Sequence, residues 1–92
     1  MKESFGVGQV TVIEDIDLAK DYKVQNVKTD GTRMPEGWPV LVKNCGIEAV
    51  TLEVKMYGME KFVATTFYPG WNPERITEIK ANADVSDIQI GY

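Results

Sequence analysis

The sequence predicts an all-β fold: a small antiparallel β-sandwich of about seven short strands, with a small β-barrel as the alternative. Three observations support this fold class. Apolar and polar residues alternate over short stretches, which is the period of a half-buried strand. Glycine, proline, asparagine and aspartate interrupt the chain about every eight to twelve residues, as they do in sandwiches and barrels. The chain contains no convincing long segment with the helical period.

The N-terminal half predicts three strands separated by polar segments. Each combines β-branched or aromatic residues with polar ones, and together they cover residues 8–14, 22–27 and 38–43. The third is expected to begin just after Pro39, because proline is tolerated at the start of a strand. Residues 1–7 are rich in glycine and polar residues and predict a flexible arm.

Two segments between these strands lack regular alternation. Residues 15–21 leave two interpretations open, either one helical turn capped by Asp15 or an acidic loop. Residues 29–37 contain Asp30-Gly31 and Pro35-Glu36-Gly37, which favour tight turns. We expect this second segment to be an exposed loop.

A β-hairpin is the clearest element of the sequence. Residues 48–57 alternate, with four apolar residues on one face: Val50, Leu52, Val54 and Met56. Gly58-Met59 predicts the turn, and residues 61–68 return as the second strand.

The C-terminal third predicts a turn, a strand and a closing strand. The Pro-Gly-Trp-Asn-Pro sequence of residues 69–73 is typical of a turn. Residues 75–80 are expected to form a strand that buries Ile76 or Ile79. The alternative is a helix capped by Asn72, which the short run of isoleucine and threonine disfavours. Residues 85–91 predict the last strand, with a break in register near Ser86 because Val85 is out of phase with the isoleucines that follow.

Composition predicts one globular domain over residues 1–92 and argues against several functions. The formal net charge is −4 and no cluster of lysine and arginine occurs, so binding of nucleic acid is not expected. One cysteine and no histidine exclude an internal disulfide and the usual zinc-ligand sets. We interpret Cys45 as a small buried side chain beside a turn. Without a long apolar run, neither a signal peptide nor a membrane span is expected, which favours the cytoplasm.

The candidate ligand or partner surface consists of aromatic residues and one loop. Four aromatic residues are candidates for a platform that stacks on carbohydrate: Trp38, Tyr57, Tyr68 and Trp71. The competing interpretation is that the tryptophans close the open ends of the sandwich beside the turns. Asp30 and Arg33 in the 29–37 loop add polar groups suited to contact with a partner.

No arrangement of residues indicates catalysis, and we expect neither an enzyme nor a cofactor. Three aspartates lie close together at positions 15, 17 and 21, but they lack the glycine and distal glutamate of a calcium-binding loop. Glu60, Glu74 and Glu78 form no spacing that identifies a glycosidase pair. Histidine-dependent triads are excluded, and no phosphate-binding glycine loop occurs.

Residues 67–79, Phe-Tyr-Pro-Gly-Trp-Asn-Pro-Glu-Arg-Ile-Thr-Glu-Ile, are followed by Val-Ser-Asp-Ile-Gln-Ile-Gly-Tyr at 85–92. Together these segments resemble small virion structural proteins of tailed bacteriophages and prophages, in which a strand enters a Pro/Gly-Trp-x-Pro turn and a short terminal strand closes the module. The resemblance covers about the last thirty residues. It implies a non-enzymatic protein associated with a capsid, as a decoration or head-fibre component, or with a tail. Such a protein is assembled into the virion in the cytoplasm of the bacterial host.

The same resemblance implies partners but carries over no functional residues. A small sandwich leaves sheet edges exposed, so pairing with another copy or docking on other virion proteins is expected. Two alternatives remain open from the sequence. One is a β-module that binds carbohydrate, and the other is a small bacterial interaction domain that uses the 29–37 loop.

Overall fold

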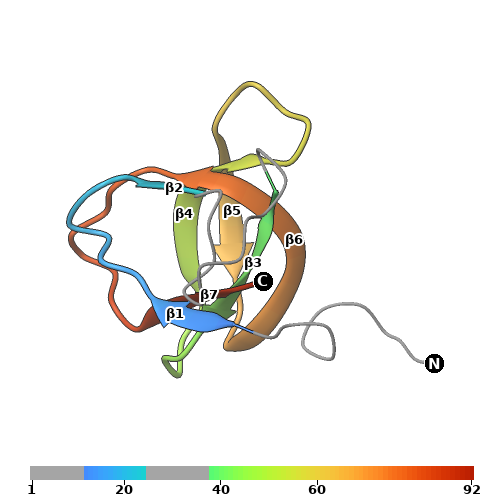
Figure 1. Ribbon diagram of the computed structural model, residues 1–92. Helices are drawn as coiled ribbons and strands as arrows, with labels where there is room; N and C mark the ends of the chain where they lie inside the picture. The colour runs from blue at the N-terminus through green and yellow to red at the C-terminus, as the bar shows by residue number, and fades with distance from the viewer. Residues whose placement is uncertain (1–11, 25–37) are drawn as a thin grey trace.

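The computed structural model describes residues 12–24 and 38–92, and these residues form seven β-strands and no helix (Figure 1). The strands are β1 Ile13–Asp15, β2 Tyr22–Lys23, β3 Val40–Asn44, β4 Val50–Met56, β5 Val63–Phe67, β6 Gly70–Ile79 and β7 Ile88–Gly91. All pairs of neighbouring strands are antiparallel. The predicted all-β class is therefore confirmed.

The seven strands belong to one sheet in the order β1-β7-β3-β6-β4-β5, with β2 paired to the end of β6. The long strand β6 connects the two halves of this sheet, as its curved path in Figure 1 shows. Its first part pairs with β3, and its last part pairs with β4 on one side and β2 on the other. Because β6 bends between these parts, the open sheet closes around its own apolar face in the manner of a small sandwich or barrel.

Two irregularities in pairing account for the bend of β6. Along β3, Val40 lies opposite Ile76 but Val42 lies opposite Asn72, so β6 contains two extra residues between these points. Along β4, the register shifts again by one residue between Lys55 and Met56. Bulges of this kind bend a strand and increase its twist. They also allow Ile76 and Ile79, which are three residues apart, both to be fully buried.

The structure corrects one prediction for this segment. Residues 69–73 were expected to be a turn, but β6 begins at Gly70. The connection from β5 is limited to Tyr68 and Pro69, and Gly70 follows with a φ of 95° that residues with a side chain rarely adopt. Pro73 is exposed and lies within the two-residue irregularity, where the missing N–H leaves no gap in the ladder with β3. The predicted strand at residues 75–80 is confirmed and is longer than expected.

The core consists of ten buried apolar residues contributed by five strands and one loop. They are Leu18, Val40, Val42, Leu52, Val54, Phe67, Ile76, Ile79, Ile88 and Ile90. The alternation seen in the sequence is reproduced in β3 and β4, where every second side chain faces the core. Burial of these side chains is the main source of stability of such a fold.

The remaining boundaries follow from local chemistry. β3 begins after Pro39, and β4 and β5 form the expected hairpin with a turn at Tyr57–Gly58. β7 begins only at Ile88, because Asp87 adopts a φ of 62° and interrupts the extended backbone after the predicted break near Ser86.

The N-terminal half is shorter in regular structure than the sequence predicts. The described part of the first strand is Ile13–Asp15, and the second strand is limited to Tyr22–Lys23 within the described residues. Of residues 15–21, Asp15 ends β1 and residues 16–21 form a loop with a turn at Leu18–Ala19 and no helical turn. The predicted arm at 1–7 and the predicted loop at 29–37 lie outside the described residues.

Candidate functional site

Two asparagines are the buried polar residues of the described structure, and both lie at the same end of the sheet. Asn44 is 2% exposed and ends β3, whereas Asn72 is 6% exposed and lies near the start of β6. Asn44 is paired with Gly70, and Asn72 is paired with Val42, so the two asparagines occupy adjacent strands. A buried amide is costly unless its hydrogen bonds are made, so the partners of these two side chains reveal what the asparagines hold in place.

The Asn44 side chain holds the loop between β3 and β4 against the end of β5. Its Oδ1 accepts a hydrogen bond from the Gly46 amide at 2.8 Å, and its Nδ2 donates to the Glu48 carbonyl at 2.8 Å. The same Nδ2 donates to the Phe67 carbonyl at 3.1 Å, which joins this loop to β5. One side chain therefore holds the β3–β4 loop at Gly46 and Glu48 and joins it to Phe67 of β5.

The Asn72 side chain holds the connection between β5 and β6. Its Oδ1 accepts a hydrogen bond from the Tyr68 amide at 3.1 Å, and its Nδ2 donates to the carbonyls of Tyr68 and Gly70 at 3.0 and 3.1 Å. The Asn72 side chain thus makes the two backbone hydrogen bonds that a neighbouring strand would make with Tyr68. These bonds end β5 and fix the backbone of Tyr68, the residue that follows β5.

These two loops present exposed apolar side chains. Ile47 is 94% exposed in the β3–β4 loop, and Tyr68 is 64% exposed in the β5–β6 connection. An isolated exposed apolar residue has little meaning, but here both residues are carried by backbone segments that buried amides hold in place. We name residues 44–49 and 68–72 the asparagine-braced end, which lies at the bottom of Figure 1.

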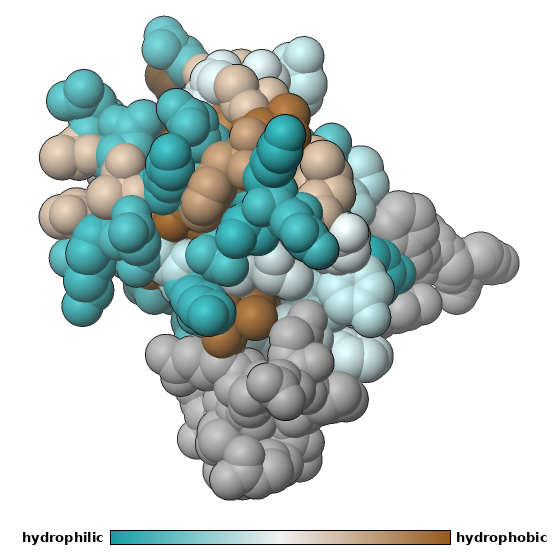
Figure 2. Space-filling view, turned by 90° about the horizontal axis from the view of Figure 1, so that it is seen from above, coloured by the Kyte–Doolittle hydropathy of each residue, from teal (hydrophilic) through white to brown (hydrophobic). Residues whose placement is uncertain are grey.

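The opposite end of the molecule also carries exposed apolar side chains. Figure 2 shows this face, where hydrophilic side chains lie among hydrophobic areas. Tyr57 and Met59 are exposed at the β4–β5 turn, and Trp38 is exposed before β3. What distinguishes Ile47 and Tyr68 is that buried amides hold the loops that carry them.

Of the residues singled out from the sequence, the structure brings Tyr68 and Trp71 to the asparagine-braced end. Trp71 is half-buried, lies opposite Lys43, and has the Lys43 Nζ 5.9 Å from its ring centre. Trp38 is 45% exposed and precedes β3, so it lies at the other end of that strand. Asp30 and Arg33 lie outside the described residues.

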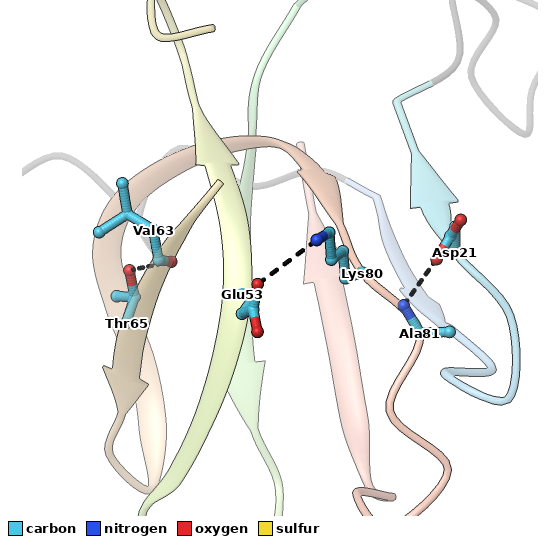
Figure 3. A network of polar contacts seen from close by, with 6 residues as sticks. All are labelled: Asp21, Glu53, Val63, Thr65, Lys80 and Ala81. Atoms are coloured by element: carbon cyan, nitrogen blue, oxygen red, sulfur yellow. Dashed lines mark hydrogen bonds and ion pairs between the residues drawn. The ribbon is translucent and has the colours of Figure 1, made fainter. Parts of the chain in front are cut away.

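The outer face of β4 and its neighbours carries a charged cluster around one aromatic ring. Lys55 forms a 3.2 Å ion pair with Glu78. Lys80 forms a 3.5 Å ion pair with Glu53, which is drawn in Figure 3. Both lysine ammonium groups also lie about 5 Å from the ring centre of Phe62. These pairs are partly or largely exposed, so each contributes little to stability.

A shallow depression of about 200 Å³ lies beside this cluster. Its lining residues include no aromatic side chain: they are Thr51, Leu52, Glu53, Ala64, Lys80, Ala81 and Asn82. Stacking on a sugar ring requires an exposed aromatic face. This depression therefore offers no carbohydrate platform.

The aspartates at positions 15, 17 and 21 each accept a hydrogen bond from a different part of the chain. The carboxylate of Asp17 accepts from the Ala19 amide, that of Asp21 accepts from the Ala81 amide, and that of Asp15 accepts from the Gln89 side chain (Figure 3 for Asp21). Among the described residues, no group of three potential ligands gathers around a metal position.

Tyr22 in β2 has a perturbed hydroxyl group. Burial raises the pKa of Tyr22, and the neighbouring Glu14 and Tyr92 raise that pKa further.

The structure corrects the interpretation of Cys45, which is exposed and not buried. Alternation along β3 explains this position, because Val40, Val42 and Asn44 face the core and the next residue faces away from it. The same reasoning could have identified Asn44 from the sequence, since it is in phase with two buried valines. The burial of Asn72 could not be identified in this way, because Asn72 lies in a segment whose sequence is typical of a turn.

The chain matches no protein-family model, no curated protein and no solved structure. Within residues 12–24 and 38–92, no helix is long and apolar enough to cross a membrane. The geometry of the asparagine-braced end is therefore the main support for a functional proposal.

Proposed function

We propose that this chain is a non-enzymatic assembly protein that binds another protein through the asparagine-braced end. One observation carries the proposal. Ile47 is 94% exposed and Tyr68 is 64% exposed, and both lie on loops that the side chains of two buried asparagines hold in place. Each asparagine makes three hydrogen bonds to the backbone of these loops or of the adjoining strand ends.

The physical argument rests on pre-organisation. Binding through a mobile loop loses free energy when the loop becomes ordered, whereas a loop that is already fixed avoids most of that loss. Apolar and aromatic side chains that insert into a partner surface supply a large share of binding energy in protein interfaces. Ile47 and Tyr68 have this chemistry. Glu48 follows Ile47 directly in the sequence, and the Lys43 ammonium lies 5.9 Å from the ring centre of Trp71 at the same end.

We further propose that the assembly is the virion of a tailed bacteriophage or prophage, with the protein associated with the capsid or the tail. This part depends on the resemblance of residues 67–79 and 85–92 to small virion structural proteins. In the structure these segments correspond to the end of β5, all of β6 and the closing strand β7. The protein would then be incorporated into particles assembled in the bacterial cytoplasm.

A photo-crosslinking experiment tests the binding role. A benzophenone amino acid is introduced at position 47 and, as a matched control, at the exposed turn residue Ala83, and the chain is expressed in its source cells. Position 47 is expected to crosslink to one defined protein that mass spectrometry identifies, and position 83 is not. Equal crosslinking at both positions, or none at position 47, would contradict the proposal.

A second experiment tests the virion role separately. Particles released by the source strain are purified on a density gradient and analysed by mass spectrometry. The wild-type chain is expected in the particle fraction in a fixed ratio to the major capsid protein, and Ile47→Asp is expected to reduce that ratio. A chain that never enters particles would exclude the virion role, even if the crosslink at position 47 identified another partner.

A further inference from the structure

The strand β5 lies at one end of the sheet order, and no described residue pairs with its outer edge. The Glu53 carbonyl in β4 accepts a hydrogen bond from the Lys80 amide, so the backbone of Glu53 faces β6. In an antiparallel pair only alternate residues exchange backbone hydrogen bonds. Because Ala64 lies opposite Glu53, the N–H and C=O groups of Ala64 and Thr66 point away from β4 at this edge.

The side chains of β5 also indicate space for a neighbouring strand. Val63 lies on the same face of β5 as the fully buried Phe67, yet it is 39% exposed. Thr65, between them on that face, is half-buried. Ala64 and Thr66 on the other face are exposed. An added strand would cover the inner row at Val63 and Thr65 and would satisfy the four outward backbone groups.

Charge distinguishes this edge from the other end of the sheet. The edge strand β1 carries Glu14 and Asp15, so two copies paired there would bring acidic groups together in a chain of net charge −4. Charged residues at an edge oppose such pairing. The five residues of β5, Val-Ala-Thr-Thr-Phe, include no charge, no proline and no glycine.

We propose that two copies of the chain pair antiparallel through their β5 edges. A twofold axis at Thr65 places Ala64 of each copy opposite Thr66 of the other, so that all four outward groups on each copy form backbone hydrogen bonds. The same register brings Val63 of one copy beside Phe67 of the other on the inner face. Contacts between an aromatic and a β-branched side chain stabilise neighbouring strands. A twofold contact of this type closes on itself and produces a dimer.

Asn72 determines where the pairing must stop. Its side chain already occupies the backbone N–H and C=O of Tyr68, which is the next outward-facing position after Thr66. The edge is thus limited at its C-terminal end. This limit makes a register centred nearer to Tyr68 unfavourable, because it would leave those backbone groups unable to pair with a second copy.

Sedimentation velocity over a range of concentrations tests the dimer. The wild-type chain is expected to change from its 10.3 kDa monomer to twice that mass as concentration rises. Thr66→Pro removes an outward N–H without removing a backbone hydrogen bond to β4, although it also removes the exposed side-chain hydrogen bond between Thr66 and Thr51. Loss of one backbone bond on each copy should weaken dimerisation roughly tenfold or more. Ala64→Lys should weaken it as well, because it adds like charges near the axis, whereas Ala83→Lys serves as the matched control.

Amide hydrogen exchange locates the interface. The Ala64 and Thr66 amides are expected to exchange rapidly in dilute protein and to become protected at high concentration, whereas the Thr65 amide is protected in both. A strictly monomeric chain at millimolar concentration, or a dimer that neither β5 variant weakens, would overturn the proposal. Ile47→Asp should leave the dimer unchanged, so failure here is distinguishable from failure of the asparagine-braced end.

Discussion

Replacing Asn44 with alanine is the perturbation that most directly probes how the asparagine-braced end is held. The substitution removes three hydrogen bonds, to the Gly46 amide and to the carbonyls of Glu48 and Phe67. At about 1 kcal/mol for each bond, the free energy of unfolding is expected to fall by about 3 kcal/mol. For a domain of this size such a loss lowers Tm by roughly 10–20 °C.

The charge variant Asn44→Asp sharpens this prediction. The aspartate keeps an acceptor for the Gly46 amide but turns a carboxylate oxygen toward the carbonyls of Glu48 and Phe67. These carbonyls repel the ionised form, so its folded-state pKa is expected to rise above the unfolded-state value. At low pH the carboxyl group is neutral, and the variant retains more of its free energy of unfolding. The difference in free energy of unfolding between the variant and wild type should grow as pH rises through the folded-state pKa.

Urea unfolding followed by tryptophan fluorescence measures both effects. Asn82→Ala is the matched control, because Asn82 is half-buried and its side chain accepts one exposed hydrogen bond, from the Asp84 amide. The control should lose no more than about 1 kcal/mol. If Asn44→Ala were destabilised by as little as the control, the asparagine would not be holding the loop, and the argument for a pre-organised site would fail.

Three further predictions concern single residues. The folded-state pKa of Tyr22 is raised above its ordinary value of 10.0, so the folded protein loses stability as pH rises above 10. Tyr22→Phe should reduce this loss, which thermal melts at pH values below and above 10 measure. Gly70→Ala meets no steric obstruction but requires alanine at a φ of 95°, so urea unfolding should show a loss of about 1–2 kcal/mol. Cys45 should react with Ellman's reagent in the folded protein nearly as fast as in the denatured protein, and strong protection would contradict its exposure.

The fold class could be predicted because strand alternation survives wherever the pairing is regular. Val40 and Val42 in β3, and Leu52 and Val54 in β4, are buried as their spacing of two residues requires. Where pairing is irregular, the sequence signal fails. Ile76 and Ile79 are three residues apart, and only the bulges of β6 place both in the core.

The site was harder to predict because its key residues belong to types that usually indicate turns. Asn72 and Pro73 occur in a segment typical of a turn, and only the tertiary pairing with β3 makes that segment a strand. Tyr68 and Trp71 were singled out from the sequence for their aromatic rings. Ile47 was not, because one isoleucine in a loop has no periodic pattern and its exposure depends on how Asn44 fixes the backbone.

A structure of the chain within its native assembly, by electron microscopy or crystallography, tests the binding role most directly. We expect the side chains of Ile47 and Tyr68 to be covered by the partner protein, with the hydrogen bonds of Asn44 and Asn72 unchanged. An assembly in which both side chains remain open to solvent would show that the protein binds through a different surface.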